Sequence, residues 1–228
     1  MKRSLSLMMT LCLSGLVTSG YSPSSHGSAP CDVGYEMSRV GDFQHAVPIL
    51  DTCISSGETS PETRRLAYQA RAWAKSNLGD VKAALQDHEA SLQIAPAVAY
   101  HEFINYASYL RAVGRTEDSL APLKFAESID KSANQANMMT QYNLGWTLQE
   151  LGRHDEAIAA FNRGIPEQPD YAFVYYRRGL SLEAIGRKDA ARADFEKTAG
   201  LIHSQEVEKT AGKYLPQVRA KLAEYGIQ

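Results

Sequence analysis

The chain has 228 residues and a formal charge of −2; 44% of its residues are apolar and 22% are charged. This composition is that of an ordinary globular protein, and its basic and acidic residues are interspersed along the chain. No Lys/Arg run of the kind that binds nucleic acid or an anionic membrane surface is present, so we expect neither partner.

The N-terminal segment, residues 1–20, has the order of a secretory signal peptide. A basic pair, Lys2 and Arg3, precedes a mostly apolar run at residues 5–17, and small residues follow. We expect this segment to be removed on export to the periplasm or out of the cell. Residues 21–29, rich in Ser, Pro and Gly, then form a flexible linker. The alternative is an uncleaved membrane anchor, although the apolar run is short for a bilayer span.

Removal of the signal peptide leaves two cysteines, Cys31 and Cys53. Two cysteines in an exported protein indicate one disulfide. Cys31 lies near the start of one predicted helix and Cys53 near the end of the next, so an antiparallel hairpin would bring them side by side. The alternative is a pair of buried free thiols, because cysteine is often a small core residue.

Five turn glycines recur at nearly even spacing beyond the linker. Small residues fill the positions seven before, five after and twelve after every one of them, and a larger residue stands nine after. Fixed columns of small residues at a period of about 34 residues indicate a helix–turn–helix repeat. The glycines are Gly41, Gly79, Gly114, Gly152 and Gly186.

The clearest hairpin spans residues 142–171, where apolar residues recur at helical spacing on both sides of Gly152. We expect Gly152 to adopt positive φ at the end of the first helix. We expect two small residues, Gly145 and Ala157, to face each other across the turn. Pro169 is expected to end the second helix.

In chain order, the repeats are expected at about residues 30–56, 61–96, 97–131, 138–171 and 172–203, with a capping helix in 204–228. Ser60 and Pro61 have the order of a helix start. Pro48 and Pro122 fall inside predicted second helices, so we expect the first and third hairpins to be less regular.

The glycine columns, together with the segments 151–157 (LGRHDEA) and 178–195, resemble the tetratricopeptide repeat family. The resemblance covers residues 29 to about 203. It implies an all-α, right-handed solenoid of about five hairpins with a C-terminal capping helix. It also implies that the first helices of successive hairpins line a concave groove, which binds an extended peptide or a partner helix.

Helical geometry places a set of aromatic, amide and basic residues on that concave side. Aromatics with Arg are frequent anchors of interfaces, and Asn can pair with a bound backbone. Tyr142 and Trp146 are expected to pack in the core instead. The groove candidates are Gln69, Trp73, Asn105, Asn143, Phe173, Tyr176 and Arg177.

Some members of the family hold a peptide's terminal carboxylate with a set of Lys, Arg and Asn side chains. Asn143 and Arg177 occupy two of those positions, but Ile104, Ser108 and Phe173 occupy others, so the charged set is incomplete. The aromatic and amide-rich face favours an internal peptide segment with apolar anchors.

Catalytic signatures are absent from the sequence: there is no phosphate loop, GxSxG, HExxH or CxxC motif, and the six histidines never pair at metal-ligand spacing. His88 holds the large core position of its repeat and is expected to pack there. We expect no enzyme activity, metal or cofactor, and a protein-binding adaptor of the envelope or of secretion. The alternatives are a self-assembling structural protein and a regulatory accessory of a cell-wall enzyme.

Overall fold

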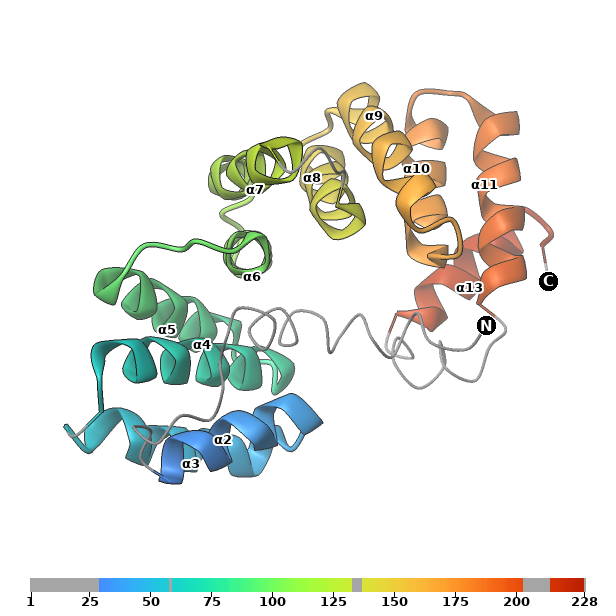
Figure 1. Cartoon of the computed structure of the whole chain (residues 1–228). Coiled ribbons are helices and arrows are strands. Elements are labelled where there is room, and N and C mark those ends of the chain that lie inside the picture. The colour runs from blue at the N-terminus through green and yellow to red at the C-terminus, as the bar shows by residue number, and fades with distance from the viewer. Residues whose placement is uncertain (1–28, 58, 133–136, 203–213, 228) are drawn as a thin grey trace. The chain divides into compact units, whose positions relative to one another are not determined.

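The structure is a computed structural model that describes residues 29–57, 59–132, 137–202 and 214–227. Within these ranges every regular element is a helix and no strand occurs (Figure 1). The predicted signal peptide and most of the predicted linker lie outside the described residues. The helices fall into an N-terminal unit that ends at Arg115 and a C-terminal unit that begins at Thr116.

The N-terminal unit consists of two helix hairpins and one further helix. The hairpin α2–α3 packs through α3 on α4, which pairs with α5, and α5 contacts α6 (Figure 1). The helices are α2 (Ala29–Val40), α3 (Phe43–Ser55), α4 (Pro61–Asn77), α5 (Val81–Ile94) and α6 (Tyr100–Ala112).

The C-terminal unit begins with the 3-10 turn η1 (Glu117–Ser119) and α7 (Leu120–Ser132). The hairpins α8–α9 and α10–α11 follow, with α7 against α8, α9 against α10 and α13 against α11. The remaining elements are α8 (Met138–Glu150), α9 (His154–Gly164), η2 (Ile165–Glu167), α10 (Ala172–Ala184), α11 (Lys188–Leu201) and α13 (Leu215–Glu224). None of the described helices is long and apolar enough to cross a membrane.

Each turn glycine has the expected left-handed backbone. Gly152, between α8 and α9, has φ of +73°, and Gly41, Gly79, Gly114 and Gly186 have φ between +78° and +92°. Because a side chain at such φ is strained, these positions favour glycine. The prediction of positive φ at Gly152 is confirmed.

The small residues of the first helices face the large residues of the second helices. A Cβ built on Gly145 would lie 2.5 Å from Cε1 of Phe161, and one on Gly179 would lie 2.7 Å from the same atom of Phe195. The atoms nearest to Gly145 belong to a fully buried ring, and the expected approach of Gly145 to Ala157 stays a prediction. A ring needs more room than a methyl group, so close packing here requires glycine.

Two arginines at the same position of the repeat join three helices each. Arg178 on α10 donates from Nε and Nη2 to the carboxylate of Asp194 on α11, at 2.8 and 2.6 Å, and from Nη1 to Oδ1 of Asn162 on α9 at 2.6 Å. Bidentate pairs of this kind combine charge with fixed geometry. The pair therefore ties the α10–α11 hairpin to the preceding one.

The same arrangement occurs in the N-terminal unit. Arg71 on α4 donates to both carboxylate oxygens of Asp87 on α5, at 2.8 and 2.6 Å, and from Nη1 to Asp51 on α3 at 2.6 Å. Lys75 adds a second cation 2.8 Å from Asp87. Both arginines stand eight residues before their turn glycine, so the repeat places them identically.

The proline expectations are corrected in part. Helix α9 ends at Gly164, and Pro166 lies in the 3-10 turn η2, so Pro169 is not the residue that ends the helix. Pro48 lies within α3 without ending it. Pro122 lies in the first turn of α7, after the 3-10 turn η1. Ser60 caps α4 as expected: its hydroxyl accepts the amide hydrogen of Thr63.

The predicted disulfide is confirmed. Cys31 on α2 and Cys53 on α3 are bonded, with Cα atoms 5.0 Å apart. Both residues are buried and pack with Tyr35, Leu50 and other residues of one apolar cluster. The bond therefore links the two helices of the first hairpin covalently.

The C-terminal helix α13 covers the last hairpin. Lys221 on α13 lies 2.9 Å from Glu183 on α10, and the hydroxyl of Tyr225 donates to the same carboxylate at 2.7 Å. The Tyr225 ring packs against Phe195 with centroids 4.7 Å apart. These contacts join α13 to both helices of the α10–α11 hairpin.

Candidate functional site

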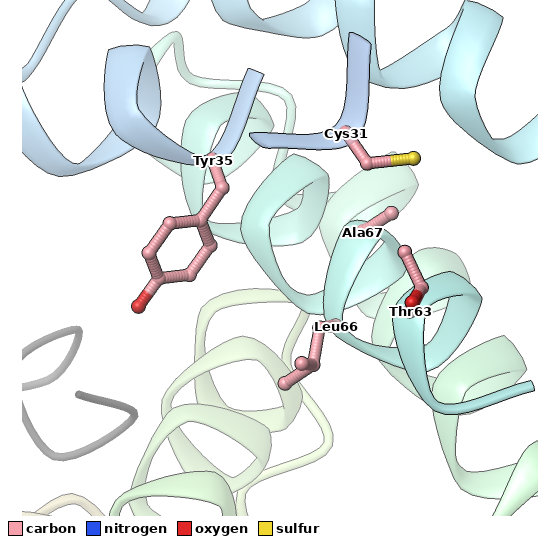
Figure 2. Close-up of a pocket in the computed structure, with 5 residues that line it drawn as sticks. All are labelled: Cys31, Tyr35, Thr63, Leu66 and Ala67. Atoms are coloured by element: carbon pink, nitrogen blue, oxygen red, sulfur yellow. The ribbon is translucent and has the colours of Figure 1, made fainter. Parts of the chain in front are cut away.

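The N-terminal unit contains a small pocket between α2 and α4 (Figure 2). Cys31 and Tyr35 line it from α2, and Thr63, Leu66 and Ala67 line it from α4. Its volume of about 10 Å³ is the space of about one water molecule. A site for an organic ligand needs far more room, so we place the candidate site elsewhere.

A continuous row of five aromatic side chains crosses the C-terminal unit. Successive ring centroids lie 5.8, 5.1, 5.8 and 6.3 Å apart, within the range of stabilising aromatic pairs. The row comes from α8, from the residue before α10, from α10 and from the residue before α13. We call it the aromatic row; its members in order are Trp146, Tyr142, Tyr171, Phe173 and Tyr214.

The aromatic row is accessible at its two ends and at its centre. Trp146 and Tyr171 are half-buried and Tyr214 is exposed, whereas Tyr142 and Phe173 are buried. The expectation that Tyr142 packs in the core is confirmed, whereas Trp146, which was expected there as well, is only half-buried. An aromatic surface that is held in place and partly exposed to solvent can accept a further apolar group.

Arg177 on α10 lies on the indole face of Trp146, with its guanidinium carbon 3.7 Å from the ring centroid. The indole Nε1–H donates to Oε1 of Glu150 at 2.5 Å, which fixes the edge of the ring. A guanidinium on an indole is a favourable cation–π pair. The two side chains therefore hold each other in one orientation.

Gln149 fixes the arginine by hydrogen bonds. Its Nε2 donates to the backbone carbonyl of Arg177 at 2.8 Å and to Oγ of Ser181 at 3.0 Å. Its Oε1 accepts from Nη1 of Arg177 at 3.0 Å. The amide thus connects α8 to α10 through the arginine that lies on Trp146.

The electrostatic effect of Arg177 reaches the neighbouring phenols. Burial, and then the adjacent Tyr142, raise the pKa of Tyr171 well above its usual value, and Arg177 opposes that rise. Burial likewise raises the pKa of Tyr176, again opposed by Arg177. Both phenols are therefore neutral near pH 7, and their hydroxyls remain hydrogen-bond donors.

Four of the predicted groove residues belong to this unit, and the structure brings them close to the aromatic row. Phe173 is a member of the row and Arg177 lies on its Trp146 end. Tyr176 is buried and packs on Phe195. Asn143 is buried, and its Nδ2 donates to the Met139 carbonyl at 2.9 Å. Their role in binding stays a prediction.

The other three predicted groove residues belong to the N-terminal unit. Gln69 is buried, and its Nε2 donates to Oε2 of Glu102 at 2.9 Å. Trp73 is half-buried against the apolar cluster that contains the disulfide, and Asn105 is half-buried on α6. Their role in binding also stays a prediction.

A buried polar cluster lies beside Gln69. Arg65 pairs with Glu102 at 2.5 Å, and both side chains are almost fully buried. His88, which is 2% exposed, stacks on Tyr106 with ring centroids 5.2 Å apart. Burial, and then the charge of Arg65, lower the pKa of His88 to about 4. The expectation that His88 is a packed core residue is confirmed.

Sequence reasoning missed Tyr171, Tyr214 and Gln149. Tyr171 precedes α10 and Tyr214 precedes α13, so neither belongs to a first helix of the repeat pattern. Gln149 lies three residues before Gly152, outside the positions assigned to the concave side. Within the described ranges, no group of three or more His, Cys, Asp or Glu residues is arranged to hold a metal ion.

Comparison with known families finds the tetratricopeptide repeat in two segments, residues 140–171 and 174–201. They correspond to the hairpins α8–α9 and α10–α11, which carry most of the aromatic row. No protein of curated function matches the sequence.

Solved structures resemble the chain over most of its length. MamA from AMB-1 is 22% identical, covering 78% of this chain and 93% of its own, with a TM-score of 0.59. MamA from Desulfovibrio magneticus RS-1 is 18% identical, with 78% and 98% covered and a TM-score of 0.63. YrrB, described as a TPR protein with an unusual peptide-binding site, is 15% identical, with 88% and 97% covered and a TM-score of 0.62.

At these identities the likeness concerns the fold. The predicted fold class, an all-α array of tetratricopeptide-type hairpins with a C-terminal helix, is confirmed.

Proposed function

We propose that the protein is a non-catalytic peptide-binding module and that the aromatic row of the C-terminal unit is its binding surface. The observation that carries the proposal is the fixed, half-buried Trp146 with Arg177 on its face, joined through Tyr142 to Tyr171. Rigid aromatic side chains with an arginine give large contact area at low entropic cost. The peptide-binding site of YrrB, a protein of similar fold, supports the same class of ligand.

The occupant we propose is an internal peptide segment with apolar anchors. Its apolar side chains would cover the exposed parts of Trp146, Tyr171 and Tyr214. Asn143, Phe173 and Tyr176 would support this surface from beneath, because the structure buries all three. Gln69, Trp73 and Asn105 form a separate proposed face on the N-terminal unit.

We further propose that the protein works as an exported adaptor in an envelope or secretion assembly. The basic pair and apolar run within residues 1–20 support export. The Cys31–Cys53 disulfide supports an oxidising compartment, since disulfides persist there and are rare in reducing cytosol. Mass spectrometry of the purified protein tests this point: a mature chain that lacks the predicted signal peptide is expected, and an intact N-terminus would contradict cleavage.

Selection of random displayed peptides against the full chain tests the binding proposal. We expect selected peptides to bind the wild-type protein and to lose about tenfold or more in affinity for Trp146→Ala, as for an interface anchor. Phe125→Ala is the matched control, because Phe125 is an exposed aromatic on α7 outside the row. Equal loss in both variants, or in neither, would contradict the proposed site. Circular dichroism establishes that each variant is folded.

A further inference from the structure

A cluster of buried polar side chains joins the α4–α5 hairpin to the start of α6. We call it the histidine cluster; its members are Arg65 from α4, His88 from α5, and His101 and Glu102 from the first turn of α6. All four are almost completely buried. The Glu102 carboxylate accepts from Nη2 of Arg65 at 2.5 Å and from Nε2 of Gln69 at 2.9 Å. Hydrogen bonds to one carboxylate therefore tie the first turn of α6 to α4.

The charges of the histidine cluster balance only while both imidazoles are neutral. Arg65 supplies one positive charge and Glu102 one negative charge. A second carboxylate near Arg65, that of Glu62 at 3.6 Å, is exposed to solvent. The groups of the described elements that face one or both rings, apart from the rings themselves, are Arg65, Tyr100, Glu102, Tyr106 and Tyr109. A proton on either ring would therefore add a buried positive charge without adding an anion.

Hydrogen bonding also disfavours a proton on either ring. In the part of the chain that the structure describes, Nε2 of His88 and Nε2 of His101 are buried without a hydrogen-bond partner. Both nitrogens of a protonated imidazole are donors, so each Nε2 would become a buried donor without an acceptor. His101 also lies in the first turn of α6, where the helix dipole disfavours positive charge. The stacking of His88 on Tyr106 offsets only part of these effects.

The shifted pKa values agree with this geometry. Burial, and then the charge of Arg65, lower the pKa of His88 to about 4. Burial lowers the pKa of His101 as well, although the charge of Glu102 opposes it. Both rings are therefore neutral in the folded protein near pH 7.

The two halves of α6 are held to the hairpin by different kinds of contact. The first turn is held by the histidine cluster, and its N-cap residue, Ala99, provides no side-chain cap. The C-terminal half instead packs in an apolar cluster, whose buried members are Ala72, Ala84, Leu85, Tyr109 and Leu110. Apolar packing does not depend on the uptake of protons. Acid is therefore expected to weaken the attachment of the N-terminal half selectively.

We propose that the histidine cluster is an acid-sensitive junction: protonation of His88 and His101 releases the N-terminal half of α6, residues 100–106, from the α4–α5 hairpin. The C-terminal half stays packed. Release returns both rings to water, where histidine takes up a proton near pH 6.5, so opening becomes more favourable as the pH falls below that value.

Opening would also change the face proposed above for the N-terminal unit. It separates Gln69 from Glu102 and moves Asn105, which lies on the released half of α6. Peptide binding at that face would therefore be lost in acid. This consequence rests on the proposed function, whereas the opening itself does not.

Residue-resolved hydrogen exchange, measured by NMR on the full chain, tests the opening. After correction for the intrinsic exchange rate, the protection of the amides of residues 103–106 is expected to fall about 20-fold or more between pH 7 and pH 5. About 20-fold follows from His88 alone, if its pKa rises from about 4 in the closed state to 6.5 in the open state. Low concentrations of urea are expected to affect these amides little, because a local opening exposes little surface. The amides of residues 109–112 are expected to exchange through a larger, urea-sensitive opening.

His88→Phe/His101→Met removes both titratable rings. It places at each position a residue type that the fourth or fifth repeat has there. We expect this double variant to lose the pH dependence at residues 103–106, and each single variant to lose part of it. The single variants serve if the double variant does not fold. His45→Gln is the matched control and is expected to keep the wild-type response, because His45 is exposed on α3.

Three results would overturn the proposal. The first is equal protection of residues 103–106 at pH 7 and pH 5. The second is equal urea sensitivity at residues 103–106 and 109–112, which would show that α6 opens only with the whole unit. The third is an undiminished fall in protection in the histidine variants. The first two results come from the wild-type protein, so they decide the question even if every variant fails to fold.

Discussion

Gly145 on α8 lies against the ring of Phe161 on α9, so closely that a Cβ on residue 145 would be 2.5 Å from Cε1 of the ring. Phe161 is fully buried, so a shift of its ring would disturb the side chains packed around it. The close approach of the two helices in this hairpin therefore depends on the absence of a side chain at residue 145.

Gly145→Ala is accordingly expected to destabilise the protein. Overpacking in a dense core destabilises by about 1–3 kcal/mol, and the higher helix propensity of alanine offsets at most about 1 kcal/mol of this loss. We expect a net loss of about 1–2 kcal/mol in the free energy of unfolding, measured by urea denaturation. Gly200→Ala on α11 is the matched control, because nothing lies within 4 Å of its added Cβ. A Gly145→Ala variant as stable as Gly200→Ala would refute the packing argument.

The Arg178–Asp194 pair is expected to show strong coupling in a double-mutant cycle. Asp194 is buried, and Arg178→Met would leave its carboxylate without a cation, at a cost of about 3 kcal/mol or more. The double variant Arg178→Met/Asp194→Leu removes both charges and is expected to be more stable than Arg178→Met alone. Urea denaturation of the four proteins measures the coupling.

The exposed pair Arg153–Glu156 is the control for that cycle, because both of its side chains are in contact with solvent. Its coupling is expected to be much weaker than that of Arg178 and Asp194. Comparable coupling in the two pairs would show that burial does not set the strength of these interactions.

His88 is expected to make the N-terminal unit sensitive to acid. Its imidazole has a pKa of about 4 in the folded protein, below the value of 6.5 for an unperturbed histidine, so the unfolded chain binds the proton more readily. The stabilising contribution is complete above about pH 6.5 and is lost as the pH falls towards 4. Between pH 7 and pH 5 we expect a loss of about 2 kcal/mol.

The groups that face His88 do not reverse the lowering of its pKa. They are Arg65 from α4 and His101, Tyr106 and Tyr109 from α6, and both Arg65 and His101 lower its pKa. His88→Phe, which places the residue type of the fourth and fifth repeats at this position, is expected to reduce the pH dependence. Parallel stability curves for the wild type and His88→Phe between pH 7 and pH 5 would contradict this prediction.

Reduction of the Cys31–Cys53 disulfide is expected to destabilise the first hairpin. The bond joins residues 22 positions apart, and closing a loop of this length restricts the unfolded chain by about 3 kcal/mol. Urea denaturation with and without reductant, with thiol titration to verify reduction, measures the loss. An unchanged midpoint in the fully reduced protein would show that burial of the two residues is sufficient for stability.

The hairpins could be predicted from sequence because backbone geometry imposes strict requirements at few positions. A turn with positive φ favours glycine, as at Gly152, and a close helix contact requires a small residue, as at Gly145. These requirements recur in every repeat, so the same residue types recur at fixed positions of the sequence. The cysteine pair was predictable for a similar reason, since its two positions follow from the antiparallel hairpin.

The polar contacts were not predictable because the residue types at their positions vary between repeats. The fourth repeat has Leu144 and Ala160 where the fifth has Arg178 and Asp194, so no column shows the ion pair. Tyr171 contributes to the aromatic row from a connection between helices, and repeat periodicity carries no information there. Such contacts depend on the side chains that three helices happen to bring together.

The indole N–H signals of the two tryptophans provide the most direct test of the proposed binding surface. Trp146 belongs to the aromatic row, and Trp73 belongs to the N-terminal unit. In a proton–nitrogen NMR titration of the full chain with a selected peptide, we predict a saturable shift of the Trp146 signal, because its N–H donates to Glu150 beside the bound segment. Binding that leaves the Trp146 signal unmoved would contradict the proposed site.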